Sequence, residues 1–482
     1  MYNLGRRERG LKNSIDWKLV ICYLLLVLFG FMNIYASIHA TTDASILSFD
    51  SRSGKQFVWI LTSLVLATMI LFIFNPRLWE VISWPTYLLV VLLLIAVIFL
   101  GVEVKGSRSW FEFGPIRFQP AEISKIATSL VLATVMSQNG FKLRNTRDFL
   151  VTAIVIGFPM LIIVAEQETG SALVYLGYVF VLYREGLSGW LLTAIGLVII
   201  LFIFTLTGSP YVSTIILLGL LSVSYRAQDG TFKRWFISDL PVIVFLAFLP
   251  KICGLFDWAF FEKLKPLGIL LIICGLTLPV YAFRAFRKKD NFLWATILAF
   301  ILGLIVIAST NFVFNNVLQD HQKKRIEVLL GLKDDPSGVG YNVHQAQIAI
   351  GSGGFFGKGY LNGTQTSFGF VPEQSTDFIF CTVGEEWGFV GCLFVILLYV
   401  WMIYRLIYDA ERCRETFTRI YGYCVASLIF MHLFVNIGMT VGVMPVIGIP
   451  LPFMSYGGSS LWAFTILLFI FIALYKEEKK YF

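Results

Sequence analysis

Long runs of apolar residues, separated by short polar segments, make up most of the chain. The run 88–100 contains no charged residue, and neither does the run 191–209. A membrane-spanning helix needs about 20 mostly apolar residues, because lipid offers no hydrogen-bond partner to an open backbone. The pattern predicts an all-α polytopic membrane protein with fourteen spans, at about 17–38, 57–74, 81–101, 121–138, 149–165, 170–184, 190–207, 211–225, 237–255, 266–283, 292–311, 377–404, 420–443 and 453–475. Several are short, so two or three are expected to be half-helices or merged pairs.

Composition supports the same class of protein. The chain is 57% hydrophobic and 14% charged with a mean hydropathy of +0.77, whereas soluble domains carry about 25% charged residues. Arg6, Arg7 and Arg9 precede the first apolar run, which lacks a small-residue cleavage pattern at its end and is therefore interpreted as an uncleaved span. The seven cysteines show no CxxC or metal-like spacing, so neither disulfides nor a zinc site are predicted.

The positive charges fix an orientation. The net charge of +8 does not indicate nucleic acid here, because the basic residues lie between apolar runs, as the positive-inside rule requires. With the N-terminus in the cytoplasm, the inside segments hold 24 of the 38 Lys and Arg residues. Nine of the 14 outside ones fall in only two segments, 102–125 and 312–376. These two outside segments are where we expect the chemistry.

The first outside segment contains Trp110, Arg117, Gln119, Glu122 and Lys125. Gln119 followed by proline is typical of a helix start, and Glu122 and Lys125, three apart, share a helix face. A local ion pair at a helix start explains this pair equally simply. The functional alternative is that charges are gathered at the outer membrane surface because they are used there.

A second acidic segment, Glu166-Gln167-Glu168, lies between two short spans. Carboxylates near a membrane boundary need water or a partner, so the segment is either an acidic rim on a plain hairpin or part of a site.

The long loop 312–376 is too rich in glycine and charge to be a plain connector. Clustered glycines between 351 and 359, beside Lys358, would let backbone N–H groups approach a phosphate, although a flexible lid is an equal interpretation. Asp377 directly precedes an apolar run, so it is either a helix N-cap or a general base at the mouth of a membrane cavity. Glu385 and Glu386 lie deeper in the same span and must face protein or water.

The stretch 436–460 carries Pro445, Pro450 and Pro452, which break any helix. Irregular backbone at membrane depth is tolerated only where it is buried in protein or lines a cavity. We therefore expect this stretch to line the same cavity.

Five stretches in this order resemble the SEDS family (shape, elongation, division and sporulation proteins): 105–110, 117–125, 340–359, 372–380 and 450–459. The resemblance covers about 1–206 and 292–475, and the motifs at 340–345 and 448–452 are similar to the RodA, or cell-elongation, branch rather than to the division branch, FtsW. It implies ten core helices with about four inserted ones, both termini inside and a large extracytoplasmic loop before Asp377. The implied divisions are 1–206 and 377–482 as the two parts of the core, 207–291 as inserted helices, 292–311 as a core span and 312–376 as the loop.

The resemblance also implies a function. SEDS proteins are peptidoglycan glycosyltransferases of the bacterial inner membrane that act on lipid II, an undecaprenyl-pyrophosphate-linked disaccharide peptide, beside a class B penicillin-binding protein. Asp377 matches the essential aspartate of the family. The expected substrate contacts are Trp110, Arg117, Gln119, Glu122, Lys125, Lys358, Gln365, Glu373 and Ser455. No cofactor is implied with certainty, and a divalent cation, Mg²⁺ or Mn²⁺, near the leaving pyrophosphate is the one candidate.

The chain departs from the family pattern at three places. Glu166 to Glu168 stands where relatives often read Gln-Pro-Asp, Ser375 stands where they often have histidine, and 207–291 looks inserted. Two other kinds of protein compete with the enzyme. A lipid II flippase would share the intramembrane carboxylates and broken helices, but the polar residues gather at the outer face and no inverted repeat is visible. A scaffold that only recruits the transpeptidase would leave Asp377 unexplained.

Overall fold

The computed structural model describes residues 15–39, 51–104, 107–114, 116–207, 210–228, 230–255, 266–289, 291–312 and 340–479, with a few positions between 314 and 330. Within this part of the chain, ten helices are long and apolar enough to cross a membrane, so the protein is a multi-pass membrane protein. Each of the fourteen predicted spans falls on helix, and the predicted span 170–184 is two short helices. The predicted all-α membrane fold is confirmed.

The chain divides into two compact units, Met1–Leu187 with Asp335–Phe482, and Ser188–Asp334. The second unit contains α10 (Gly189–Thr207), α11 (Pro210–Gln228), α12 (Phe232–Arg234), a π-helical turn (Trp235–Asp239), α13 (Leu240–Leu255), α15 (Pro266–Lys288) and α16 (Asn291–Phe312). It has its own apolar core, in which Leu201, Leu217 and Phe300 are almost fully buried. The predicted family divisions of the chain, including the inserted segment 207–291, stay a prediction.

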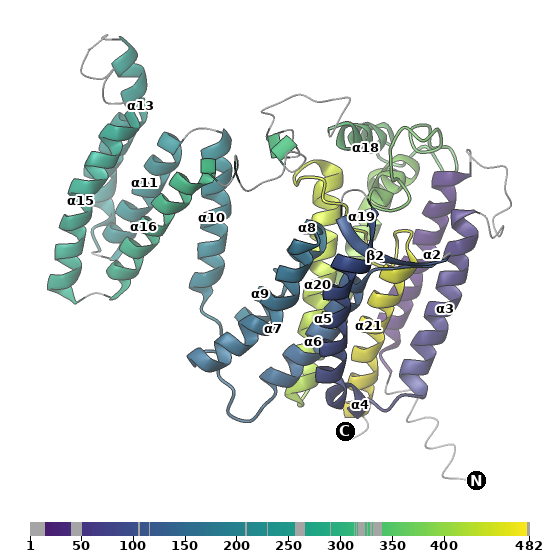
Figure 1. The fold of residues 1–482 in the computed structure, drawn as a ribbon. Helices are drawn as coiled ribbons and strands as arrows, with labels where there is room; N and C mark the ends of the chain where they lie inside the picture. The colour runs from purple at the N-terminus through teal and green to yellow at the C-terminus, as the bar shows by residue number, and fades with distance from the viewer. Residues whose placement is uncertain are drawn as a thin grey trace. The chain divides into compact units, whose positions relative to one another are not determined.

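The first unit carries all the candidate site residues. Its helices are α2 (Trp17–Ile38), α3 (Arg52–Phe72), α4 (Arg77–Val81), α5 (Ser83–Leu100), α6 (Pro120–Met136), α7 (Thr146–Ala165), α8 (Thr169–Tyr175), α9 (Tyr178–Arg184), α18 (Tyr341–Ser352), α19 (Ile379–Glu411), α20 (Thr416–Val441) and α21 (Gly458–Lys479). In Figure 1, α18 lies at one end of this bundle, beyond the end of α19.

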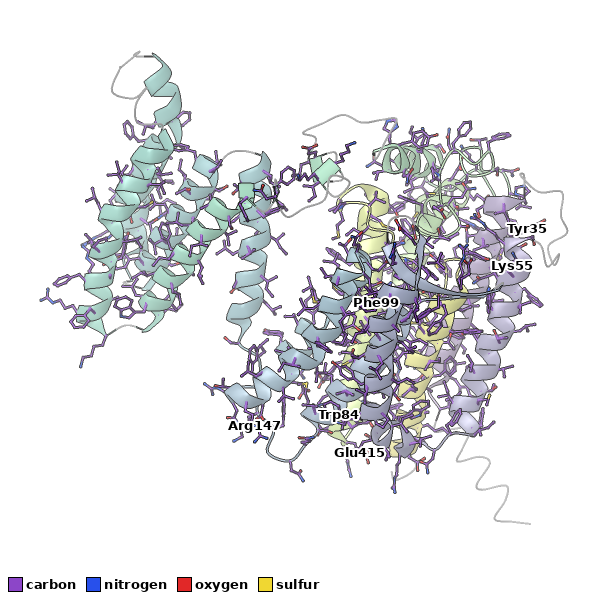
Figure 2. The ribbon with its side chains drawn as sticks, in the orientation of Figure 1. Tyr35, Lys55, Trp84, Phe99, Arg147 and Glu415 are labelled. Carbon is purple, nitrogen blue, oxygen red and sulfur yellow. The ribbon has the colours of Figure 1, made fainter. Side chains whose placement is uncertain are left out.

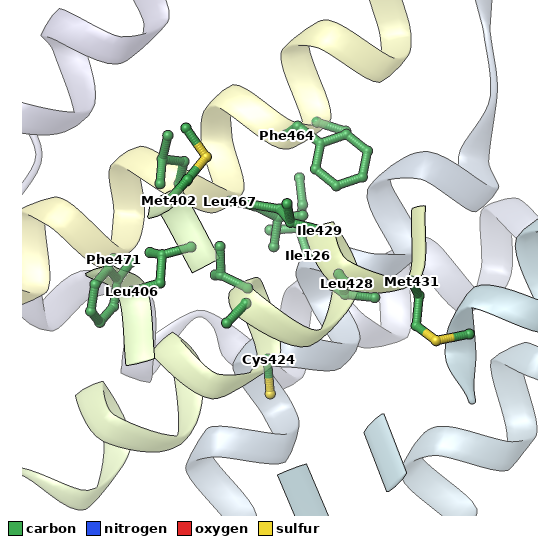
Figure 3. Packing of buried hydrophobic residues seen from close by; sticks show 14 of the residues in the cluster. Ile126, Met402, Leu406, Cys424, Leu428, Ile429, Met431, Phe464, Leu467 and Phe471 are labelled. Carbon is green, nitrogen blue, oxygen red and sulfur yellow. The ribbon is translucent and has the colours of Figure 1, made fainter. Parts of the chain in front are cut away.

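The centre of this unit is formed by α6, α20 and α21, with α19 beside them. In the most apolar stretch of α20, and likewise in that of α21, 72% of the residues are buried, against 28% in that of α3. Leu428 and Ile429 from α20 meet Phe464 and Leu467 from α21, with Ile126 of α6 close by (Figure 3). Outer helices keep one apolar face for lipid, so the residues between the central helices are the ones held in a fixed geometry.

The two faces of the bundle can be told apart by their contacts. Asp16, before α2, pairs with Arg405 at 2.6 Å, and Glu478 near the end of α21 accepts a hydrogen bond from the Arg414 amide at 3.0 Å. Both ends of the described chain therefore lie at one face. Tyr35 and Lys55 mark the opposite end of the bundle from Arg147, Trp84 and Glu415 (Figure 2).

A small antiparallel sheet precedes α6, which the sequence analysis did not predict. Its strands are β1 (Val102–Val104), β2 (Ser107–Phe113) and β3 (Ile116–Phe118), with Val102 opposite Trp110 and Glu112 opposite Arg117. Gly114 makes the tight turn between β2 and β3 with a φ of +61°, a backbone conformation that glycine adopts without strain. The chain then enters α6 with Gln119 as N-cap and Pro120 in the first turn, so the predicted helix start is confirmed.

Candidate active site

Asp377 lies in the turn that leads into α19. The helix begins at Ile379 with Phe378 as its N-cap residue, so the N-cap interpretation of Asp377 is wrong. The Asp377 side chain is half-buried. Its carboxylate faces Gly448, because a Cβ placed on that glycine would lie 3.3 Å from Asp377 Oδ2. Gly448 also has a φ of +78°, so glycine is favoured there for two separate reasons.

The turn is held by its main-chain carbonyls. Those of three successive residues each accept one hydrogen bond: Ser375 from the Tyr456 amide at 2.8 Å, Thr376 from the Ser455 hydroxyl at 2.6 Å, and Asp377 from Asn436 Nδ2 at 2.8 Å. These donors come from α20 and from the segment between α20 and α21. The acid is therefore placed by α20 and by the segment that follows it, and not by the helix that it precedes.

The proline-containing segment 442–457 is irregular, as predicted, and it packs against that turn. Asn436 donates a second hydrogen bond to the Ile449 carbonyl at 2.7 Å, and the Leu451 amide donates to Ser455 Oγ at 2.8 Å. Ser455 is 5% exposed. Its hydroxyl thus links the segment to the turn, and its predicted contact with substrate stays a prediction.

Glu373 opens the same turn with a φ of +53°, which is uncommon for a residue with a side chain. Its carboxylate accepts a hydrogen bond from the Thr376 hydroxyl at 3.0 Å. The neighbouring Gln374 is buried and donates from Nε2 to the Ser37 carbonyl at the end of α2. Glu373 therefore lies close to Asp377 along a constrained turn, and its predicted contact with substrate stays a prediction.

The glycine-rich segment packs tightly on α19. A Cβ on Gly353 would lie 2.0 Å from the Gly384 carbonyl oxygen, and one on Gly357 would lie 2.1 Å from that of Glu386. No side chain fits in such gaps. Close backbone packing accounts for these glycines, so neither of the two predicted roles, a phosphate cradle or a flexible lid, is needed to explain them.

Glu385 of α19 holds the loop 358–366 in place. It is fully buried, and its carboxylate accepts hydrogen bonds from Lys358 Nζ at 2.6 Å and from the backbone amides of Thr364, Gln365 and Thr366 at 2.8–2.9 Å. Lys358 is 27% exposed in this pair. Its predicted role as a cation for phosphate would compete with this ion pair. Gln365, another predicted substrate contact, has a half-buried side chain.

Glu122 and Lys125 form an ion pair of 2.8 Å inside the bundle. The Lys125 ammonium also lies 3.0 Å from His432 Nε2 and 4.9 Å from the centre of the Phe464 ring, and it has no exposed surface. The structure therefore places this pair in a buried cluster between α6, α20 and α21. Direct contact of Lys125 or Glu122 with substrate stays a prediction, as does that of Gln119, which is 6% exposed.

Trp110 is half-buried on β2, and Arg117 on β3 is exposed and paired with Glu112 at 2.9 Å. The sheet is fastened to the α7–α8 connection, because Ser107 and Ser109 both donate to Glu168, at 3.0 and 3.1 Å. Glu166 in the same connection is 2% exposed. Burial, and then the charge of Glu168, raise the pKa of Glu166 to about 8.

Arg52 is a candidate that the sequence analysis missed. It is the first residue of α3, and its Nη1 donates to Ser375 Oγ at 2.8 Å. A single arginine after a polar segment carries no motif, so only the fold brings it to this turn. The structure thus joins Asp377, Glu373, Ser455 and Arg52 at one place.

A divalent cation was predicted near the leaving group. Within the described residues, no group of three acidic, histidine or cysteine side chains is close enough to hold a metal ion. These residues do not form a protein cage for Mg²⁺ or Mn²⁺, and a divalent cation near the leaving group stays a prediction.

Comparison with known families decides what kind of protein carries this site. The FtsW/RodA/SpoVE family model, described as cell cycle protein, matches residues 16–218 and 267–480. The chain belongs to this family. The SEDS membership predicted from the five motifs is thereby confirmed, and residues 219–266 are the internal part that the SEDS family model does not match.

Relatives within the SEDS family agree along almost the whole chain. Peptidoglycan glycosyltransferase RodA of Treponema pallidum is 30% identical over 95% of this chain and 96% of its own length. Peptidoglycan glycosyltransferase MrdB of Escherichia coli is 28% identical over 93% of this chain and 90% of its own. Among solved SEDS structures, a chain of a peptidoglycan synthase complex that coordinates polymerization and crosslinking has a TM-score of 0.60 at 22% identity, covering 96% of this chain and 98% of its own. The rod shape determining protein RodA of Thermus thermophilus has 0.51 at 22% identity, covering 96% and 97%. These two structures show the fold.

Proposed function

We propose that this protein is a peptidoglycan glycosyltransferase that polymerises lipid II into glycan strands for cell elongation. The family membership and the names of the relatives support the activity. The observation that carries the proposal is the position of Asp377, a half-buried carboxylate just before α19, whose own backbone carbonyl is held by Asn436 of α20. A general base must be held within reach of the proton that it removes, and this turn provides such a support.

The reaction joins two lipid-linked sugars. Asp377 takes the proton from the 4-hydroxyl of the acceptor sugar while that oxygen attacks the anomeric carbon of the donor. The new glycosidic bond forms, the bond from the anomeric carbon to the pyrophosphate oxygen breaks, and undecaprenyl pyrophosphate leaves with the electron pair. General-base help of this kind contributes roughly 10²- to 10⁴-fold to the rate.

Other residues act on charge and position. Negative charge develops on the pyrophosphate, so fixed cations near it lower the barrier. Arg117 is exposed on the sheet beside the site and supplies one such charge, and Lys358 supplies another if substrate draws it from Glu385. Trp110 packs on the sugar or on the start of the lipid chain, as amphipathic aromatic side chains do at membrane interfaces.

The protein lies in the bacterial inner membrane with both termini in the cytoplasm and Asp377 facing outside. The positive-inside charge pattern supports this orientation. It agrees with the structure, because Asp16 and Glu478 lie at one face and the Asp377 turn lies next to Ser37, at the far end of α2. The lipid II substrate then stays in the membrane throughout the reaction.

A class B penicillin-binding protein is the proposed partner, which crosslinks the strands made here. The solved complex with a similar fold, which coordinates polymerization and crosslinking, supports this pairing. The flippase alternative gains no support from the names of the relatives.

The test is glycan polymerisation from lipid II by the purified protein, co-expressed with its partner while the transpeptidase is blocked. Asp377→Ala and Asp377→Asn should lose nearly all polymerisation and keep the melting temperature of the wild type. Asp148→Asn, in the first turn of α7 at the other face, is the matched control and should polymerise normally. Polymer from Asp377→Ala at the wild-type rate would remove the base, and no polymer from wild type with the correct partner would move weight to the flippase.

A further inference from the structure

Arg52 brings a positive charge to the turn that carries Asp377. Its guanidinium donates to the hydroxyl of Ser375, which has no exposed surface and stands two residues before the acid. The Arg52 side chain itself is exposed. One of its donors is therefore used to fix the arginine in place while the remainder of the fork stays accessible.

The position of Arg52 also has electrostatic consequences for a neighbour. Tyr456 is bonded to the Ser375 carbonyl through its amide. Burial raises the pKa of Tyr456, and the nearby positive charges of Arg52 and Arg117 oppose that rise. Two guanidinium groups from different elements, α3 and β3, thus act on the phenol of a residue whose amide is bonded to this turn.

The two arginines differ in their partners. Arg117 is paired with Glu112, whereas among the described residues no carboxylate forms an ion pair with Arg52. An arginine held by a neutral hydroxyl keeps its full charge available for an anion. Guanidinium groups bind phosphate through paired hydrogen bonds, which makes them the usual choice for phosphate recognition.

We propose that Arg52 binds the pyrophosphate group of the lipid-linked substrate, next to the acid at the outer end of α3. This inference rests on the proposed glycosyltransferase function and names a contact for its leaving group. Arg52 then lowers the barrier by stabilising the charge that appears on the pyrophosphate as the bond from its oxygen to the anomeric carbon breaks. No further reactant is needed, because the electron pair that leaves the anomeric carbon is the one that Arg52 stabilises.

The experiment compares Arg52→Gln, Arg52→Lys, Ser375→Ala and Lys55→Gln with wild type. Lys55 is an exposed cation in the first turn of the same helix and serves as the charge control (Figure 2). Three quantities are measured: the KM for lipid II, the inhibition constant of undecaprenyl pyrophosphate, and that of undecaprenyl monophosphate. Binding of undecaprenyl pyrophosphate is also followed by native mass spectrometry, which needs no turnover.

Arg52→Gln should raise the inhibition constant of the pyrophosphate roughly 10-fold or more, the size expected for a charge-assisted hydrogen bond. It should change that of the monophosphate less, and Arg52→Lys should recover part of the loss. Ser375→Ala removes the tether but keeps the guanidinium, so it should affect pyrophosphate binding less than Arg52→Gln does. Lys55→Gln should behave as wild type.

The inference would be overturned if Ser375→Ala and Arg52→Gln raised the KM for lipid II equally while both bound undecaprenyl pyrophosphate as wild type does. Arg52 would then be only a tether for the turn. Unchanged kinetics in Arg52→Gln would overturn it as well. Both results assume a wild type that polymerises. A wild type that binds undecaprenyl pyrophosphate through Arg52 but makes no polymer would instead count against the glycosyltransferase and leave the Arg52 contact standing.

Discussion

The close approach of Gly448 to Asp377 predicts a defect that combines strain with displacement of the acid. In Gly448→Ala, the new Cβ would lie 3.3 Å from Asp377 Oδ2, at a residue with a φ of +78°. An L-residue in this left-handed conformation costs roughly 1–2 kcal/mol. The tight contact also pushes the carboxylate by a few tenths of an ångström. A misplacement of about 1 Å can cost 10²-fold in rate, so we expect polymerisation to fall roughly 3- to 10-fold.

The control separates the two effects. Gly140 has a φ of +85°, and no atom lies within 4 Å of the position that a Cβ would take. Gly140→Ala should therefore lose a similar amount of stability, measured by titrating the purified protein with denaturing detergent, while its polymerisation rate stays normal. The reasoning is refuted if Gly448→Ala polymerises at the wild-type rate, or if Gly140→Ala loses as much activity as Gly448→Ala at equal fold content.

Two further predictions concern buried carboxylates. Glu385→Gln removes the charge that holds Lys358 and three loop amides, so it should lower the free energy of unfolding by about 3–5 kcal/mol and expose the loop 358–366 to protease. Glu411→Gln, in an exposed pair, should lower it by at most about 1 kcal/mol. Equal protease resistance in both variants would contradict this. Burial, and then the charge of Glu168, raise the pKa of Glu166 from an ordinary value of 4.5 to about 8. The folded state therefore holds that proton more tightly than the unfolded chain does, and wild type loses stability as the pH rises across this interval. Glu166→Gln should lack this loss, with melting temperatures that match wild type near pH 4.5 and exceed it above pH 8, and parallel curves would show that the proton is not held.

The spans could be predicted from sequence because each depends only on a local run of apolar residues. The start of α6 could be predicted for the same reason, since Gln119 and Pro120 are adjacent signals. The sheet from Val102 to Phe118 was missed, because three short strands within a polar segment give no long alternation. Asp377 was found through the family motif, although its alternative as an N-cap could be rejected only by seeing where α19 begins.

The contacts of the site depended on pairs far apart in the chain. Lys125 meets His432, 307 residues later, and neither the pairing nor its burial can be predicted from spacing. Lys358 looked like a free cation beside a glycine run until the fold placed Glu385 against it. Arg52 carried no signal at all, because its meaning depends on Ser375, 323 residues away.

The three carbonyls that fix the turn before α19 also bear on how relatives of this protein are recognised. Asn436, Ser455 and Tyr456 hold the main chain of residues 375–377 and do not depend on the side chains at 375 and 376. A change of side chain at 375 therefore removes none of the groups that form these three hydrogen bonds, although it alters the contact with Arg52. Searches that demand a fixed tripeptide ending in the aspartate will pass over chains of the same design. Patterns built on the asparagine, the serine and the glycine that surround the acid will find them.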